Sequence, residues 1–508
     1  MKQSNGKFYE DEYELALLDL LVEQGWEYTY GGKIHRHNRD VLLLDDLTSY
    51  LNRRYPDLTA QDIEEISNKL RHVSGQTHFE TLRNTYYLIR DGFRYVRHDD
   101  GKTFDIDFID YDGSDNTYRV VNQFEVGYGL GDNIRIPDVI LFVNGMPLCI
   151  FELKNPADEN ATIADAYDQI HIRYLRDIPH LLRYCPLSCI SDATVNNTKI
   201  GTTYTPYEHY YAWKKVNNED PVATKGLDQV RTIVAGVYEP SRFIEIFRDY
   251  CYFPDKDFDK EQEIVCRYPQ FFATRMLREH VREVYARGDR KGGTYFGATG
   301  CGKTYTMMFL ARQLSLRCAE LGSPTIVMIV DRDDLQTQAG KLFLRSTEYL
   351  SLGAAQVIPN RTILKQELAA RDSGGFFICT IQKFCEEIGE LNTRRNIICF
   401  SDEAHRTQLG TGTTLKVRTR TDVDEPETDT QAIATTEKDE SKIGAFVTKP
   451  YAEHLRTAFP HATFVGFTGT PIDETIQVFG DIVDRYTMQQ AVDDEITKPL
   501  KYIPRIAQ

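Results

Sequence analysis

Hydrophobic and polar positions follow two different patterns along this chain. In the second half, short uninterrupted apolar runs alternate with segments of helical periodicity. The apolar runs are Thr294–Phe296, Thr325–Val330, Phe376–Thr380, Ile397–Phe400 and Thr463–Phe467. Strands that are covered on both faces in a parallel sheet have this continuous apolar character. The pattern therefore predicts an α/β core with a parallel sheet in this half.

The first half combines helical periodicity with the alternating texture of half-buried strands. Strands are expected at 104–109, 119–126, 138–143 and 147–154, and helices at 11–24, 59–72, 157–176 and 226–253. Asn144 and Gly145 separate the last two strands and are typical of a hairpin turn. Residues 204–222 show no period and are expected to be irregular.

The length of 508 residues is enough for more than two domains with separate cores. We expect an N-terminal domain over residues 1–256 and the parallel α/β domain over residues 257–475, which begins near a helix at 271–287. Residues 476–508 are expected to lead into a further domain. Residues 411–443 are rich in Thr, Asp and Glu and are interpreted as a mobile insertion.

Composition restricts the classes of protein that this chain could be. The formal net charge of -16 argues against a protein that coats nucleic acid indiscriminately, but it leaves DNA binding in a groove open. The 10 cysteines are scattered, and Cys185 and Cys189 have no second cluster of metal ligands nearby, so core filling is preferred to a zinc site. No apolar run is long enough to span a membrane and no signal peptide is evident, which predicts a cytoplasmic protein without membrane contact.

A phosphate-binding loop follows the first apolar run of the second half. Its residues are Gly297, Ala298, Thr299, Gly300, Cys301, Gly302, Lys303 and Thr304, and they fit the pattern G-x-x-x-x-G-K-[ST]. The loop lies between a predicted strand and a predicted helix, so backbone N–H groups and the helix N-terminus converge on an anion. Lys303 is expected to reach the β and γ phosphates of ATP, and Thr304 to bind Mg²⁺.

Two acidic residues follow the fourth apolar run of the second half. Ser401, Asp402 and Glu403 come directly after Phe400. Carboxylates at the carboxyl end of a parallel strand lie in the crevice where ligands collect. We expect Asp402 to hold Mg²⁺ through water and Glu403 to polarise the water that attacks the γ phosphate.

A second cluster of charged residues lies on the predicted hairpin near the N-terminus. Asp138 precedes one strand, and Glu152 and Lys154 lie two apart on the next, so these two share a face. Asp138 opposes Glu152 only if the numbers of paired residues on the two strands sum to 290. We expect a three-residue turn, Asn144, Gly145 and Met146, to provide this pairing. The pair could then hold Mg²⁺ and Lys154 could assist a phosphoryl transfer. A structural ion pair at a strand end is the alternative.

The motifs of the second half resemble those of superfamily 2 helicases and translocases of the DEAH-box-like kind. The resemblance extends to residues 330–334, to residues 380–383, and to Thr468, Gly469, Thr470 and Pro471, which resemble the motif that couples hydrolysis to strand movement. It also implies that Gln270 reads adenine, although a solvated surface residue is the alternative. Because such motors close ATP between two domains, the chain is expected to lack the second motor domain and the arginine finger that this domain supplies.

Together the two clusters resemble the restriction (HsdR-type) subunit of type I restriction-modification enzymes. The resemblance implies an endonuclease domain of the PD-(D/E)xK kind, with a mixed sheet and flanking helices, ahead of a RecA-like motor. It implies ATP and Mg²⁺ as cofactors, and double-stranded DNA with methyltransferase (modification) and specificity subunits as partners. A stand-alone helicase-nuclease of DNA repair and a DNA-binding module with an inactive nuclease fold are the alternatives.

That family also has a Gln-x-x-x-Tyr motif in the helix after the nuclease lysine. In this chain four residues separate Gln169 from Tyr174, one more than in the motif. In an α-helix Gln169 and Arg173 would share a face and Tyr174 would be rotated away. We therefore expect Gln169 to contribute to the site, whereas Tyr174 could equally pack against the sheet.

Overall fold

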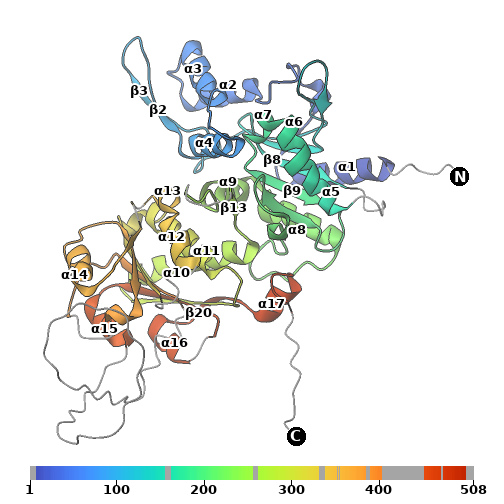
Figure 1. Cartoon of the computed structure of the whole chain (residues 1–508). Helices are drawn as coiled ribbons and strands as arrows, with labels where there is room; N and C mark the ends of the chain where they lie inside the picture. Colours follow the sequence, from blue (N-terminus) through green and yellow to red (C-terminus); the bar gives the residue numbers. More distant parts are fainter. Residues whose placement is uncertain are drawn as a thin grey trace, which may run out of the picture.

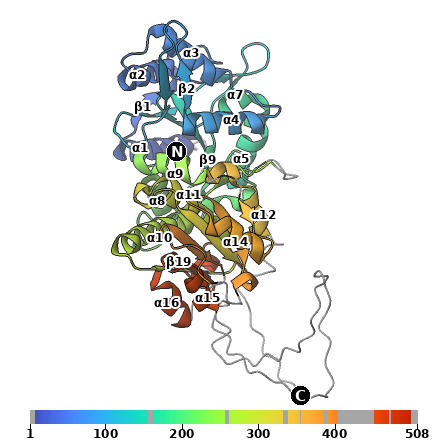
Figure 2. The same ribbon diagram turned by 90° about the vertical axis from the view of Figure 1, so that its left-hand side faces the viewer.

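The computed structural model describes residues 7–154, 162–255, 261–330, 338–351, 353, 355–384, 389–402, 451–470 and 473–498. These residues form two regions that lie one above the other (Figures 1 and 2). The expected insertion at 411–443, the residues 331–334, Glu403 and Pro471 lie outside the described residues.

The N-terminal region is built on a mixed sheet of seven strands, as the resemblance implied. In sheet order they are β1 (Glu27–Tyr30), β4 (Tyr118–Asn122), β7 (Val139–Val143), β8 (Met146–Leu153), β9 (Leu187–Ser191), β10 (Thr198–Thr202) and β11 (Tyr211–Ala212). The pairs β1–β4 and β8–β9 are parallel and the other four pairs are antiparallel. All residues of β7 and β8 are buried, which places this hairpin in the core.

Helices and short strand pairs surround this sheet. The helices are α1 (Lys7–Glu23), α2 (Leu44–Arg54), α3 (Ala60–Arg71), α4 (His78–Asp91), α5 (Ile163–Asp168), α6 (Leu175–Asp177), α7 (Pro179–Leu182), α8 (Gly226–Val237) and α9 (Pro240–Asp249). A π-helix, η2 (Gln169–Tyr174), joins α5 to α6, and 3-10 turns lie at η1 (Gly31–Lys33) and η3 (Tyr207–His209). The strand pairs are β2 (Phe93–Val96) with β3 (Thr103–Ile106), β5 (Val126–Gly127) with β6 (Ile134–Arg135), and β12 (Cys251–Tyr252) with β13 (Ile264–Val265).

The turn between β7 and β8 has two residues, so the predicted three-residue turn is wrong. Asn144 and Gly145 have φ values of 49° and 79°, as a type I′ hairpin requires, and Val143 pairs with Met146. A β-bulge at Leu148 then shifts the register by one residue. Beyond the bulge Val139 pairs with Phe151, and the numbers of these paired residues sum to the predicted 290. The register predicted for Asp138 and Glu152 is therefore present at their end of the hairpin.

The second region is built on a sheet of seven strands in which every pair is parallel, as predicted. In sheet order they are β16 (Gln356–Val357), β17 (Phe376–Thr380), β15 (Thr325–Val330), β18 (Ile397–Ser401), β19 (Thr463–Thr468), β14 (Lys291–Gly297) and β20 (Ile482–Tyr486). Each of the five predicted apolar runs is one of these strands. The two edge strands, β16 and β20, were not predicted.

Helices cover the parallel sheet and connect its strands. They are α10 (Tyr268–Arg287), α11 (Lys303–Leu316), α12 (Gln338–Leu344), α13 (Thr347–Leu350), α14 (Arg361–Ala369), α15 (Tyr451–Ala458) and α16 (Asp473–Phe479), with 3-10 turns η4 (Ala319–Leu321) and η5 (Ile381–Phe384). The expected domain boundary at residue 475 falls inside α16, and β20 beyond it still pairs with β14.

The segment after β20 returns to the N-terminal region. There α17 (Met488–Asp493) lies beside α8, away from the other elements of the C-terminal third (Figure 1). Asp494 forms a buried ion pair with Lys214, and the hydroxyls of Tyr268 and Tyr486 both donate to it, over 2.5 and 2.6 Å. One carboxylate therefore ties the N-terminal region, α10 and β20 together. A further domain beyond this segment remains a prediction.

Within the described ranges, no helix is long and apolar enough to cross a membrane. Cys185 and Cys189 are 0% and 1% exposed, and both pack in the core of the N-terminal region, as preferred from the sequence.

Candidate active sites

The hairpin β7–β8 brings Asp138 and Glu152 to the same end of the N-terminal sheet. Because Val139 pairs with Phe151, the next residues outward are Asp138 and Glu152, and the backbone N–H of Leu153 donates to Asp138 Oδ2 over 2.6 Å. Glu152 is 1% exposed, so its carboxylate needs polar partners inside the protein.

Two side chains bond directly to this carboxylate, and a third links those two. Lys154 Nζ donates to Glu152 Oε1 over 2.9 Å, and the Tyr174 hydroxyl donates to Glu152 Oε2 over 3.0 Å. Gln169 joins both of these residues, because its Oε1 accepts from Lys154 over 3.2 Å and its Nε2 donates to the tyrosine oxygen over 2.8 Å. The four side chains form one closed hydrogen-bonded ring around the Glu152 carboxylate.

The expectation that Tyr174 is rotated away is wrong, because the helix is not an α-helix at this point. Residues Gln169–Tyr174 form a π-helix, in which backbone bonds run from i to i+5. Residues five apart then lie on one face, so Gln169 and Tyr174 both face Glu152. Tyr174 is 1% exposed, so its aromatic ring is packed in the core, as the alternative stated. Its hydroxyl, however, takes part in the hydrogen bonds around Glu152.

Burial and mutual repulsion shift the ionisation of this cluster. The pKa of Asp138 is raised well above its ordinary value, first by burial of the carboxyl and then by the charge of Glu152. The pKa of Tyr174 is also raised, first by burial and then by Glu152, so the phenol stays a proton donor at physiological pH.

The two carboxylates fit a small divalent cation. Mg²⁺ prefers carboxylate oxygens and completes its coordination with water and substrate phosphates, so two protein carboxylates are sufficient. A divalent cation between them would offset the repulsion that raises the pKa of Asp138. Among the described residues no group of three or more His, Cys, Asp or Glu side chains is arranged as a metal site.

The phosphate loop has the backbone geometry that anion binding needs. It begins at the end of β14, and Gly300 and Gly302 adopt φ values of 84° and 85°, a region that residues with a side chain rarely adopt. The helix α11 starts at Lys303, whose Nζ donates to the carbonyl of Gly297 over 3.3 Å. Thr304 lies in the first turn of the same helix, and its contact with Mg²⁺ remains a prediction.

Gln270 lies against the phosphate loop. It is 4% exposed, so the alternative of a solvated surface residue is wrong. Its Oε1 accepts from the backbone N–H of Arg267, and its Nε2 donates to the carbonyls of Cys301 and Gly302 over 3.4 and 3.3 Å. Gln270 thus links the start of α10 to the loop, and a contact with adenine remains a prediction.

The order of strands brings the other residues predicted for the nucleotide site to the same edge of the sheet. Asp402 follows β18 and is 7% exposed, and β18 is separated from the phosphate-loop strand β14 by β19 alone. Two strand spacings place these two strands roughly 10 Å apart. At the end of β19, a β-carbon on Gly469 would lie 3.6 Å from Lys303 Nζ and 3.3 Å from Thr299 Oγ1. Thr468 Oγ1 accepts from the N–H of Thr470, which fixes the turn in this position.

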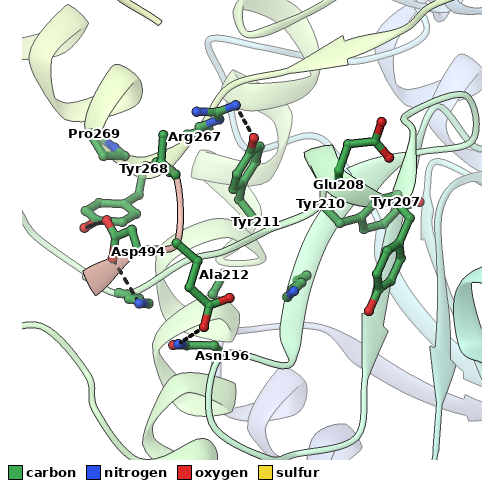
Figure 3. A pocket seen from close by; sticks show the side chains of 14 residues that line it. Asn196, Tyr207, Glu208, Tyr210, Tyr211, Ala212, Arg267, Tyr268, Pro269 and Asp494 are labelled. Atoms are coloured by element: carbon green, nitrogen blue, oxygen red, sulfur yellow. Dashed lines mark hydrogen bonds and ion pairs between the residues drawn. The ribbon is translucent and has the colours of Figure 1, made fainter. Parts of the chain in front are cut away.

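A cavity of about 250 Å³ is lined by residues of the N-terminal region, of the start of α10 and of the segment after α17 (Figure 3). Tyr211 of β11 and Arg267, which precedes α10, line it and contact each other, with the guanidinium stacked 3.6 Å from the ring centre and donating to the tyrosine hydroxyl. Lys214 and Asp494 line another wall. No sequence pattern predicted this cavity, because its residues come from three distant segments.

Two family models match this chain. Residues 7–209 match "Type I restriction enzyme R protein N terminus (HSDR_N)" and residues 269–508 match "SWI2/SNF2 ATPase". The HindI type I restriction enzyme endonuclease subunit of Haemophilus influenzae is 32% identical over 97% of this chain and 46% of its own length. The putative MjaIXP endonuclease subunit of Methanocaldococcus jannaschii is 27% identical over 100% of this chain and 47% of its own.

The chain therefore spans about half the length of the curated relatives that it matches. Among solved structures, the type ISP restriction-modification enzyme LlaBIII bound to DNA is 15% identical, covers 47% of this chain and 16% of its own, and has a TM-score of 0.28, too low to carry an argument. The predicted resemblance is confirmed by the family models and the curated relatives: residues 7–209 belong to the type I restriction enzyme R protein family, and residues 269–508 to the SWI2/SNF2 ATPases.

Proposed function

We propose that this chain acts as the restriction subunit of a type I restriction-modification system. In this role it binds ATP and Mg²⁺, translocates double-stranded DNA and cleaves unmodified DNA in a Mg²⁺-dependent reaction. The carrying observation is the ring of Lys154, Gln169 and Tyr174 around Glu152, next to Asp138, in a chain that also has a phosphate loop. A purely structural ion pair would need one partner for Glu152 and no second carboxylate beside it.

At the nuclease site, Asp138 and Glu152 would hold the cation. When bound, Mg²⁺ lowers the pKa of a coordinated water and offsets charge on the phosphate. Tyr174 and Gln169 fix the rotamer of Glu152 through their hydrogen bonds, and Lys154 places its ammonium group within reach of the same carboxylate. That ammonium group can exchange Glu152 for a phosphate oxygen when DNA arrives and stabilise the charge that develops there.

At the motor site, the phosphate loop would bind the triphosphate, with Lys303 reaching the terminal phosphates. Thr304 and Asp402 supply hard oxygen atoms for Mg²⁺, and Glu403 is proposed to orient the attacking water. Gly469 would sense the state of the nucleotide, because a displacement of Lys303 or Thr299 moves the atoms that it faces. Thr468 and Thr470 would transmit that change towards DNA.

Recognition of the DNA sequence is proposed to lie in methyltransferase and specificity subunits of the same system. This assignment follows the named relatives, which are described as endonuclease subunits of type I enzymes. It distinguishes the proposal from a stand-alone repair helicase, which would cleave without such partners.

The test reconstitutes the full-length subunit with its methyltransferase and specificity subunits and measures ATP hydrolysis and cleavage of unmethylated plasmid. Asp138→Ala is expected to abolish cleavage and to leave ATP hydrolysis within about twofold. Lys303→Ala is expected to abolish both. Asp132→Ala and Lys291→Ala change exposed residues of the same types outside the sites and serve as matched controls. Cleavage that persists in Asp138→Ala, or that needs no partner subunit, would refute the proposal.

A further inference from the structure

A second pocket, of about 180 Å³, lies on the N-terminal region and is rich in cationic side chains. Arg39, Arg71, His180 and Arg183 line it, together with one carboxylate, Asp40, and apolar side chains. A concentration of positive charge is unexpected on a chain whose formal net charge is -16. We call these four residues, three arginines and one histidine, the basic pocket.

The cationic groups of the basic pocket are not neutralised by the protein. Among the described residues, none of its three arginines has a carboxylate oxygen within 4.0 Å. Arg39 and Arg183 each donate to a backbone carbonyl, of Gly129 and Val73, and these bonds fix the guanidinium groups without removing their charge.

Two buried nitrogen atoms add to the unmet hydrogen-bonding capacity. Within the described part of the chain, His180 Nε2 and Arg183 Nε are shielded from solvent and have no hydrogen-bond partner. Buried polar atoms of this kind usually have a partner, and a missing one points to a ligand, ion or water. The pKa of His180 is lowered, first by burial and then by the charges of Arg39 and Arg183, which reflects a positive potential in the pocket.

Size and charge together indicate the chemistry of the ligand. A space of about 180 Å³ corresponds to roughly six water volumes, which suits a phosphate group and its hydration water. Guanidinium groups bind phosphate oxygens with charge-assisted hydrogen bonds, and three of them line this pocket. The shared chemistry is a phosphate, supplied either by a DNA backbone or by a free anion.

The basic pocket is rigidly connected to the elements that carry Asp138 and Glu152. The loop with Arg39 lies along β5, where Asn38 accepts from Gly127, and its hairpin partner β6 ends three residues before Asp138. On the other side, α7 with His180 follows η2 and α6, and Asp177 of α6 forms an ion pair of 2.6 Å with Arg135 of β6.

One loop of the basic pocket contacts the turn at the end of β7 that lies away from the carboxylates. Leu43, between pocket residues on the same loop, donates to the carbonyl of Gly145 at the turn, whereas Asp138 lies at the opposite end of β7. Five residues of antiparallel strand span about 17 Å. Half a helical turn of B-DNA has the same length, about 17 Å.

We propose that the basic pocket holds a backbone phosphate of duplex DNA, about half a helical turn from the phosphodiester at Asp138 and Glu152. This inference rests on the proposed nuclease function and adds to it a residue-level contact for the substrate. A duplex held at two points along one sheet would present its scissile bond to the carboxylates in a fixed register.

The test measures binding of a fluorescein-labelled duplex of about 30 base pairs to the intact chain in EDTA, by anisotropy, between 50 and 300 mM NaCl. The double variant Arg39→Gln, Arg71→Gln is expected to bind 5–10-fold more weakly, with a salt slope reduced by about 1, because each phosphate contact contributes about 0.9. The control, Arg94→Gln with Arg231→Gln, removes the same charge from exposed arginines elsewhere and is expected to bind as wild type.

Equal losses in both double variants, or no binding of duplex by wild type, would overturn the proposal. A second arm follows the His180 imidazole by NMR with duplex and with inorganic phosphate. A shift with duplex supports the DNA contact, and a shift with phosphate alone would assign the pocket to a free anion instead. Because EDTA prevents cleavage, binding is measured independently of the nuclease reaction. A pocket-dependent salt slope, in a subunit that never cleaves with Mg²⁺ and ATP when reconstituted with its partner subunits, would reject the nuclease function while leaving the phosphate contact.

Discussion

The hydroxyl of Tyr174 offers the sharpest test of the proposed nuclease site, because Tyr174→Phe removes one oxygen atom and keeps the ring. The change deletes the donor to Glu152 Oε2 and the acceptor for Gln169. A hydrogen bond to a charged group contributes about 1.5–3 kcal/mol, which corresponds to roughly 10–100-fold in an equilibrium constant. Partners that orient a metal-binding carboxylate have effects of the same size, about 10–100-fold.

Binding of Mn²⁺ to the chain without nucleotide, followed by electron paramagnetic resonance, measures this effect without partner subunits. Tyr174→Phe is expected to weaken binding about 10–100-fold. Tyr184→Phe is the matched control, because this tyrosine is equally buried and its hydroxyl donates only to the carbonyl of Leu70, over 3.3 Å. A double-mutant cycle with Glu152→Gln is expected to be non-additive, since both residues act through one carboxylate.

Equal Mn²⁺ affinity in Tyr174→Phe and Tyr184→Phe would refute this reasoning. So would strictly additive effects with Glu152→Gln, because they would mean that the tyrosine acts through the general stability of the region. Urea unfolding of each variant separates the two explanations, since loss of an oriented ligand need not lower the free energy of unfolding.

Three further predictions concern stability in the absence of metal. Asp138→Asn is expected to have a higher thermal midpoint than wild type at pH 8 and a similar one near pH 4. The reason is that the folded state raises the pKa of Asp138, so wild type loses stability as the pH rises. A difference in midpoint that does not change with pH would contradict this. Gly145→Ala is expected to destabilise by at least about 1 kcal/mol more than Gly101→Ala in urea, since both have positive φ but only the first would place a β-carbon against a backbone oxygen; equal effects would contradict the clash. Asp494→Asn is expected to lower the free energy of unfolding by about 3 kcal/mol through its buried lysine partner, and the exposed Asp493→Asn by much less; equal losses would show that the ion pair contributes nothing.

The interior strands of the parallel sheet could be predicted because burial on both faces leaves a continuous apolar run. Thr325–Val330 and Phe376–Thr380 match β15 and β17 residue for residue. The edge strands could not be predicted in this way. β20 reads Ile-Val-Asp-Arg-Tyr and β16 has two residues, so neither has the length or the apolar character of a central strand.

The sequence predicted that Asp138 and Glu152 meet, because both were required to share a face of the sheet. It did not predict that a two-residue turn and a β-bulge produce this register. A β-bulge at Leu148 leaves no clear sequence signal, because the neighbouring residues are apolar on both sides of the hairpin. The role of Tyr174 was missed for a related reason. Side-chain spacing was judged with the period of an α-helix, and the π-helix became visible only in the backbone bonds of η2.

These two irregularities lead to opposite expectations for changes in chain length. In the hairpin, adding or removing one residue between the bulge and the turn would move the side chains of one strand to the opposite face of the sheet. Asp138 and Glu152 would then lie on different faces. In the helix, the π-helical turn of η2 already contains one residue more than an α-helical turn. Deletion of one residue, such as Ile172, would let this turn become α-helical and keep Gln169 and the tyrosine on the same side. Homologues would then be expected to vary in the spacing of the helical pair and to keep the number of residues from the first carboxylate to the second.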